Sequence, residues 1–284
     1  MVSENTQKAE PAVTQPAVAE PAVAEPSWAV RSIEGVGKGL IGSVEELGRL
    51  ASLTADVARW SVRPPYRPQN LFFQLDFVGV GSAFIVLLTG LFTGMVFAHQ
   101  SARAFEMFDA QSLVGPTVAL TLTRELAPVF SALMVTMRAG SAMCTELGTM
   151  RVTEQVDALE TMAVNPVQYL LVPRVLAGLF MVPLLTLIFD TFGIGGAYVV
   201  AVLGQGVSAG TFIARTQSWL DTPDVFEGLI KGAVFGLAVA LICCFKGYNA
   251  TGGAKGVGQA TTAAMVNSAL SIFILDFIVG VLLH

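Results

Sequence analysis

The sequence predicts an all-α integral membrane protein, and its composition and segment lengths carry that prediction. Of the 284 residues, 54% are hydrophobic and 13% are charged, against roughly 25% charged residues in ordinary soluble domains. The mean hydropathy is +0.66. Five apolar segments each approach the ~20 residues that cross the hydrocarbon core of a bilayer. They are approximately Phe77 to Ala98, Pro116 to Met137, Val175 to Leu203, Leu229 to Phe245 and Ala263 to Leu283.

The first thirty residues have a different composition from the rest of the chain. Residues 1–30 contain PAV, PAVAEP and PAVAEP in succession. A Pro/Ala/Glu-rich tract of this kind is typical of disorder, because it has too little apolar surface to form a core. We expect a disordered tail, and a docking peptide for another protein is the alternative.

Residues 31–70 are expected to form an amphipathic helix and a connector. Apolar residues recur at helical spacing from Ile33 to Leu50, with charged residues between them. Arginines then surround Trp60 and Tyr66, and prolines stop the helix before the first span. Basic and aromatic residues beside a membrane entry favour a helix in the cytoplasmic interface. A soluble helix packed on a partner is the other interpretation.

The distribution of lysine and arginine predicts the orientation of residues 71–284, the predicted transmembrane domain. Basic residues concentrate before the first span, between the second and third, and between the fourth and fifth. They are Arg59, Arg63, Arg67, Arg138, Arg151, Arg174, Lys246 and Lys255. Because cytoplasmic loops carry this excess, we expect a cytoplasmic N-terminus and, after five spans, a C-terminus on the opposite side.

A charged helix is predicted between the second and third spans, within Glu146 to Pro166. An apolar stripe lies on one face, and acidic residues lie largely away from it. The stripe is Val152, Val156, Leu159 and Ala163, and the acidic residues are Glu154, Asp157 and Glu160. Thr149 is the candidate N-cap. The acidic face suits a basic groove on a soluble partner, whereas packing on the chain's own loops is the alternative.

Four charged residues are predicted to reach similar depth in the outer half of the membrane: Arg124, Glu125, Lys231 and Asp276. Each would cost at least ~2.5 kcal/mol if exposed to lipid, so pairing or a wet cavity is expected. They form either structural ion pairs or part of a lipid cavity. In the cavity, Arg124 and Lys231 would meet a phosphate headgroup, with Glu125 and Asp276 as counter-ions. Asp190, nearer mid-membrane, is a candidate fifth member.

The first span offers an apolar wall for such a cavity. Gly90 and Gly94 form G-x-x-x-G, which lets helices approach closely, and Phe97 follows on the same span. The glycines fit either packing within one protomer or a dimer interface.

Catalytic and metal-binding patterns are not found in the sequence. The three cysteines lack metal-ligand spacing. Gly35 to Gly39 lacks the spacing and hydroxyl of a phosphate-binding loop, and Gly252 to Gly258 is expected to be a flexible turn. The scattered cations exclude a nucleic-acid partner. We therefore expect a non-enzymatic protein without a cofactor of its own.

Two long blocks of sequence resemble a known family. They are RELAPVFSALMVTMRAGSAMCTELGTMRVTEQVDALETMAVNPVQYLLVPRVLAG and GLIKGAVFGLAVALICCFKGYNATGGAKGVGQATTAAMVNSALSIFILDF. Over roughly residues 70 to 284 the chain resembles the MlaE/YrbE family, the permease subunits of bacterial ABC transporters that work with MCE proteins.

This resemblance implies a dimeric permease of the bacterial inner membrane that moves phospholipid. It implies a separate ATPase subunit that binds ATP and Mg, a periplasmic MCE protein, and a STAS-domain accessory protein as a further candidate partner. Gln100 matches a polar position of the family, and Gln100 and Phe97 are therefore candidate lipid-binding residues of the first span. By motif, the ATPase-coupling residues would be Glu154, Gln155, Asp157, Ala158, Leu159, Glu160 and Thr161.

Two other classes of function remain open from the sequence. One is a secondary carrier in which Asp190, Glu125 and Asp276 relay protons. The other is a non-transporting membrane anchor of an extracytoplasmic complex, which would tolerate neutralisation of all the membrane charges.

Overall fold

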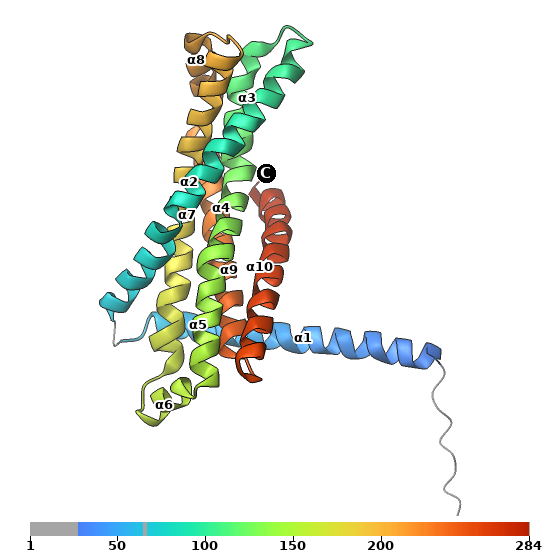
Figure 1. Cartoon of the computed structure of the whole chain (residues 1–284), viewed down its shortest axis with the longest axis vertical. Helices are drawn as coiled ribbons and strands as arrows, with labels where there is room; N and C mark the ends of the chain where they lie inside the picture. The colour runs from blue at the N-terminus through green and yellow to red at the C-terminus, as the bar shows by residue number, and fades with distance from the viewer. Residues whose placement is uncertain (1–27, 65–66, 284) are drawn as a thin grey trace, which may run out of the picture. The chain divides into compact units, whose positions relative to one another are not determined.

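The computed structural model describes residues 28–64 and 67–283, and all regular structure in these ranges is helical (Figure 1). Residues 1–27 of the predicted tail and Pro65 and Tyr66 of the predicted connector lie outside these ranges. Within them, five helical segments are long and apolar enough to cross a membrane. They are Pro68–Glu106, Gln111–Val152, Val167–Gly204, Thr222–Tyr248 and Gly253–Leu283. The predicted all-α architecture with five spans is confirmed, and each span is longer than its predicted apolar core.

The helix α1 (Trp28–Ser61) begins before the predicted start of the amphipathic pattern at Ile33. The chain divides into two compact units inside α1, between Leu47 and Gly48. In the second unit, the end of α1 places Val57 in an apolar cluster, with Leu53 and Trp60 packed against it. Leu53, Val57 and Trp60 are three or four residues apart, so they share one helix face.

The spans contain four π-helical segments, each of which widens one turn of the helix. The first span is the single helix α2 (Pro68–Glu106), the fourth is α9 (Thr222–Tyr248) and the fifth is α10 (Gly253–Leu283). The second span consists of the 3₁₀ turn η1 (Gln111–Leu113), α3 (Val114–Thr121), the π-helical η2 (Leu122–Leu126), α4 (Ala127–Val135), the π-helical η3 (Thr136–Gly140) and α5 (Ser141–Val152). The third consists of η4 (Val167–Leu171), α7 (Val172–Tyr198) and η5 (Val199–Gly204).

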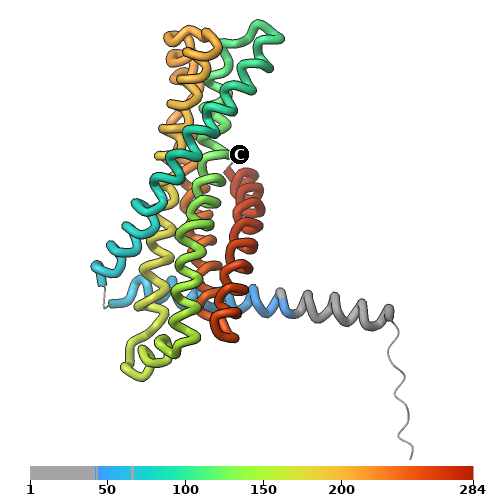
Figure 2. Tube along the Cα trace, in the orientation of Figure 1, coloured from blue at the N-terminus to red at the C-terminus, as the bar shows by residue number. Residues whose placement is uncertain are grey.

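Two short helices cap the opposite ends of the bundle (Figure 1). The helix α6 (Gln155–Thr161) connects the second and third spans at one end, and α8 (Ala209–Trp219) connects the third and fourth at the other. The helix α7 packs on both α2 and α9, and α10 packs on α9 and α5. The trace in Figure 2 shows α2 crossing the other spans obliquely, with α10 at one side of the bundle.

The turn before α10 is shorter than the sequence predicts. The predicted flexible segment, Gly252 to Gly258, is helical from Gly253 onward. Gly252 and Gly253 have φ of 86° and 68°, a left-handed conformation that glycine adopts without a Cβ penalty. Two glycines therefore make the turn, and the later ones continue α10.

The G-x-x-x-G pair of α2 packs against α7 of the same chain. A Cβ on Gly94 would lie 1.9 Å from the carbonyl oxygen of Gly193, and one on Gly90 would lie 2.8 Å from that of Phe189. The two backbones are thus in direct contact, which only glycine permits. Of the two interpretations of this motif, packing within one protomer is the one that the structure supports.

Replacing Gly94 by alanine is expected to destabilise the α2–α7 contact by about 1–3 kcal/mol, because the added methyl group must force two backbones apart. The matched control is Gly195→Ala in α7, where an added Cβ meets nothing within 4 Å. Thermal unfolding in detergent measures both. Equal midpoints for the two variants would contradict the close contact.

Candidate functional site

The second span carries Arg124 and Glu125 in the π-helical segment η2. Pro128 is the second residue of α4, four residues after Arg124, and proline has no N–H with which to bond the carbonyl four residues back. The carbonyl oxygen of Arg124 instead accepts a hydrogen bond from the Lys231 ammonium at 3.0 Å. Single π-helical turns occur frequently at functional sites, and this one exposes a backbone acceptor beside two charged side chains.

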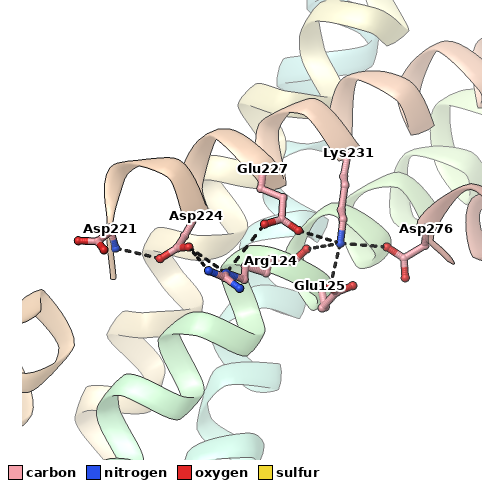
Figure 3. Close-up of polar contacts among 7 residues, drawn as sticks. All are labelled: Arg124, Glu125, Asp221, Asp224, Glu227, Lys231 and Asp276. Carbon is pink, nitrogen blue, oxygen red and sulfur yellow. Dashed lines mark hydrogen bonds and ion pairs between the residues drawn. The ribbon is translucent and has the colours of Figure 1, made fainter. Parts of the chain in front are cut away.

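Lys231 is the buried centre of a charge cluster (Figure 3). Its side chain is 0% exposed, and its ammonium lies 2.8 Å from Glu125 Oε1. Two further carboxylates stand at 3.5 Å and 3.7 Å, from Glu227 and Asp276 respectively. A buried ammonium needs partners of this kind, because removal from water costs several kcal/mol.

Arg124 is bound by a second group of carboxylates on α9. Its Nε and Nη2 donate to Asp224 Oδ1 at 2.9 Å and 2.5 Å, and Glu227 lies 3.9 Å away. Asp224 is held by the first turn of α9, where its other oxygen accepts from the backbone N–H of Asp221 at 2.9 Å. Although held in this way, the Arg124 side chain remains 37% exposed.

The structure brings the four predicted residues together and adds two that the sequence interpretation missed. Lys231 pairs with Glu125 and Asp276, as expected, whereas Arg124 pairs with Asp224 and Glu227. The cluster therefore has two cations and four carboxylates, and the formal charges do not cancel as they do in the predicted set. The missed signal is the spacing of Asp224, Glu227 and Lys231, which places them on one face of a helix.

Asp190 does not join this cluster by an ion pair within the described residues. Its side chain is buried in α7, and its Oδ1 has no hydrogen-bond partner there. The proton relay of the secondary-carrier interpretation would need hydrogen bonds that connect Asp190, Glu125 and Asp276, and within the described residues Asp190 Oδ1 makes no hydrogen bond to either of the other two.

The two predicted residues on α2 differ in their surroundings. Phe97 is partly buried and packs against the main apolar core, while Gln100 is exposed near the end of the span. Among the described residues, neither has a hydrogen bond to the charge cluster. Their predicted part in lipid binding therefore rests on their position along the span.

The predicted charged helix is α6, and it presents acidic residues to solvent. Val156 is buried and Leu159 partly buried in an apolar cluster with the end of α1 and the start of α7. The other predicted coupling residues are exposed; they are Glu154, Gln155, Asp157, Ala158, Glu160 and Thr161. The apolar side of α6 thus anchors it to the chain, and the acidic side is available for contact.

Two of the acidic residues between Glu146 and Pro166 are neutralised by ion pairs with arginines. Asp157 pairs with Arg151 at 2.5 Å, and Glu146 pairs with the buried Arg174 at 2.8 Å. Glu154 and Glu160 have no ion pair in the described part of the chain, so they dominate the exposed acidic surface of α6.

The predicted boundaries of this helix are wrong at both ends. Thr149 is not an N-cap, because α5 continues through it to Val152 and its hydroxyl donates to the carbonyl of Thr145. The cap position belongs to Glu154, which has φ 59°. Ala163 has φ 58° and lies beyond the helix end at Thr161. The apolar pattern alone does not reveal these two left-handed residues.

Comparison with known proteins finds one family model, described as "Permease MlaE", that matches residues 71–282. A "Probable ABC transporter permease protein" from Rickettsia bellii is 40% identical over 244 residues, which are 86% of this chain and 94% of the relative. The "Intermembrane phospholipid transport system permease protein MlaE" from Haemophilus influenzae is 38% identical over 254 residues, covering 88% and 96% of the two chains.

A plant protein is also similar to this chain. "Protein TRIGALACTOSYLDIACYLGLYCEROL 1, chloroplastic" from Arabidopsis thaliana is 38% identical over 212 residues, which are 75% of this chain and 61% of the relative. The family match includes the whole charge cluster and α6.

Proposed function

Because the chain belongs to the MlaE permease family, we propose that it is the membrane subunit of an ATP-driven phospholipid transporter. It passes lipid between the bacterial inner membrane and a periplasmic assembly of MCE proteins. The relative from Haemophilus influenzae, whose name describes intermembrane phospholipid transport, supports this choice of cargo.

The observation that carries the proposal is a partly exposed Arg124 held beside a partly exposed Glu125. Their side chains are 37% and 45% exposed, in a helical segment that is long and apolar enough to cross a membrane. A guanidinium binds phosphate through parallel N–H donors. Arg124 is therefore the residue that contacts a lipid headgroup. Lys231 is fully buried, and its hydrogen bonds to Glu125 and to the Arg124 carbonyl oxygen hold this segment of η2 in place.

The energy for transport comes from another subunit. The sequence contains no phosphate-binding loop, so a partner ATPase binds ATP and Mg. The acidic surface of α6 supports docking of that partner on the cytoplasmic side. The N-terminus is then cytoplasmic and the C-terminus periplasmic. A second copy of the permease and a STAS-domain protein complete the membrane complex.

Reconstitution tests the proposal directly. The chain, its ATPase and its MCE partner are placed in vesicles with fluorescent phospholipid, and transfer to the MCE protein is followed with and without ATP. We expect transfer that depends on ATP. An equal rate without nucleotide would support a secondary carrier, and no transfer under either condition would support the anchor interpretation.

Replacing Arg124 by glutamine is expected to lower the ATP-dependent transfer rate by about ten- to a hundredfold. Charge-assisted hydrogen bonds contribute about 1.5–3 kcal/mol each, and the headgroup loses at least one. Arg215→Gln on α8 is the matched control, since Arg215 is exposed and outside the cluster. Comparable rates for Arg124→Gln and wild type, with equal assembly, would leave the cluster a purely structural role.

A further inference from the structure

A cavity with a charged lining lies at the α6 end of the bundle, and no residue of the Arg124 and Lys231 cluster lines it. It has a volume of about 370 Å³ and is enclosed by the end of α1, the start of α2, the connector from α6 to η4, and the start of α7. The side-chain amide of Gln168 donates to the carbonyl oxygen of Arg63 at 2.7 Å. This bond joins two walls of the cavity, so its shape is set by the fold of the second unit.

Arg63 and Arg67 are the charged residues among those that line the cavity, and no carboxylate accompanies them in the described lining. The guanidinium carbon of Arg67 lies 4.8 Å from the centre of the Tyr169 ring, and that of Arg63 lies 5.8 Å from the Trp60 ring. Stacking on a ring positions a guanidinium while leaving its N–H groups free to donate. The two arginines are therefore arranged to receive an anion.

The opposite part of the lining is apolar and belongs to the membrane spans. Leu71 lies in the first span, and Val172 and Leu176 lie in the third. The cavity thus joins a cationic rim to an apolar wall that continues into the bilayer. A soluble anion would match only the rim, whereas an amphiphile with a phosphate and acyl chains matches both parts.

We propose that this cavity binds an anionic phospholipid from the leaflet on the α6 side of the membrane. Arg63 and Arg67 hold the phosphate, and Leu71, Val172 and Leu176 contact the beginning of the acyl chains. The volume is at the lower end of the ~300–1,000 Å³ of small-molecule sites. It accordingly holds the headgroup and glycerol, while most of the acyl chains stay in the bilayer.

A lipid in this cavity would lie against the connector that follows α6. Ala163, Val164 and Asn165 of the connector after α6 line the same cavity. A bound lipid would therefore contact both the connector after α6 and the end of α1, and would stabilise their positions relative to each other. Binding at this site does not depend on the transport proposed above, because neither Arg124 nor Lys231 is among the lining residues.

Trp60 lines the cavity and provides a direct measurement of occupancy. The full chain with Trp28→Phe and Trp219→Phe retains Trp60 as its sole tryptophan. In nanodiscs of phosphatidylcholine, phosphatidylglycerol with brominated acyl chains is titrated at constant total lipid, and quenching of Trp60 fluorescence is followed. Brominated phosphatidylcholine is titrated in parallel. We expect half-maximal quenching at a much lower mole fraction of phosphatidylglycerol, and equal quenching by the two lipids would overturn the proposal.

The variant Arg63→Gln/Arg67→Gln is expected to reduce this preference for phosphatidylglycerol by about 25-fold, since each basic residue near the surface contributes about fivefold. The control Arg49→Gln/Arg59→Gln removes two exposed arginines of α1 that do not line the cavity, and should change the preference less than twofold in this assay. Equal losses in the two variants, or no loss in the first, would overturn the proposal.

Inorganic phosphate separates a lipid site from a site for a free anion. At constant ionic strength, replacing chloride by phosphate should leave Trp60 quenching by brominated phosphatidylglycerol unchanged, because the acyl contacts are not available to the free ion. Displacement of the lipid by phosphate would overturn the assignment to phospholipid.

Discussion

Replacing Lys231 by methionine is expected to lower the free energy of unfolding by about 3–5 kcal/mol, the cost of removing one partner from a buried ion pair. The ammonium is wholly buried, and Glu125, Glu227 and Asp276 surround it. Without it, the carboxylates lose their common counter-ion and repel one another. Thermal unfolding and size-exclusion chromatography in detergent measure the loss.

A compensated variant distinguishes this electrostatic cause from lost packing. Lys231→Met/Glu125→Gln/Asp276→Asn removes the cation and two of its three carboxylates, and leaves Glu227 near Arg124. It should recover a large part of the lost stability. Lys255→Met, at an exposed lysine of α10, is the control for loss of one charge. A Lys231→Met protein as stable as Lys255→Met would contradict the role of Lys231 as the centre of the cluster.

Reversing the charge of Glu154 and Glu160 together is expected to weaken binding of the partner ATPase by about a hundredfold or more. Placing like charges against each other in an interface costs several kcal/mol, and each 1.4 kcal/mol is about tenfold in affinity. The variant is Glu154→Lys/Glu160→Lys, and co-purification from membranes measures it. Asp157 is left unchanged because its pair with Arg151 would make a loss of folding difficult to separate from a loss of docking.

The matched control is Glu45→Lys/Asp56→Lys, which makes the same change of charge at two exposed carboxylates of α1. Its co-purification with the ATPase should remain near wild type. If Glu154→Lys/Glu160→Lys retains the ATPase as well as this control does, α6 is a helix packed only on its own chain, as the alternative sequence interpretation has it.

The charge cluster shows where the sequence interpretation was sufficient and where it was not. Depth along a span follows from counting residues at ~1.5 Å each, so Arg124, Glu125, Lys231 and Asp276 could be predicted to meet. The partners of Arg124 could not be predicted in the same way. Asp224 precedes the apolar part of α9, and only the packing of the helices places its carboxylate on the Arg124 guanidinium.

The glycines of α2 and the boundaries of α6 are likewise predicted only in part by the sequence. G-x-x-x-G marks a close approach of helices but does not name the partner helix, which here is α7. An apolar stripe marks the buried face of α6, but Glu154 and Ala163 adopt left-handed conformations that side-chain periodicity does not encode.

The sequence by itself determined the all-α membrane class, the five spans and the acidic character of α6, because length, hydropathy and helical periodicity are local properties of the chain. Only the tertiary structure decided which carboxylates neutralise Arg124 and Lys231, and that Arg63 and Arg67 share a cavity with Tyr169 and Leu176. Several of these contacts join residues about one hundred positions apart. They depend on the rotation and depth of packed helices, which the π-helical segments shift by amounts that the local pattern does not show.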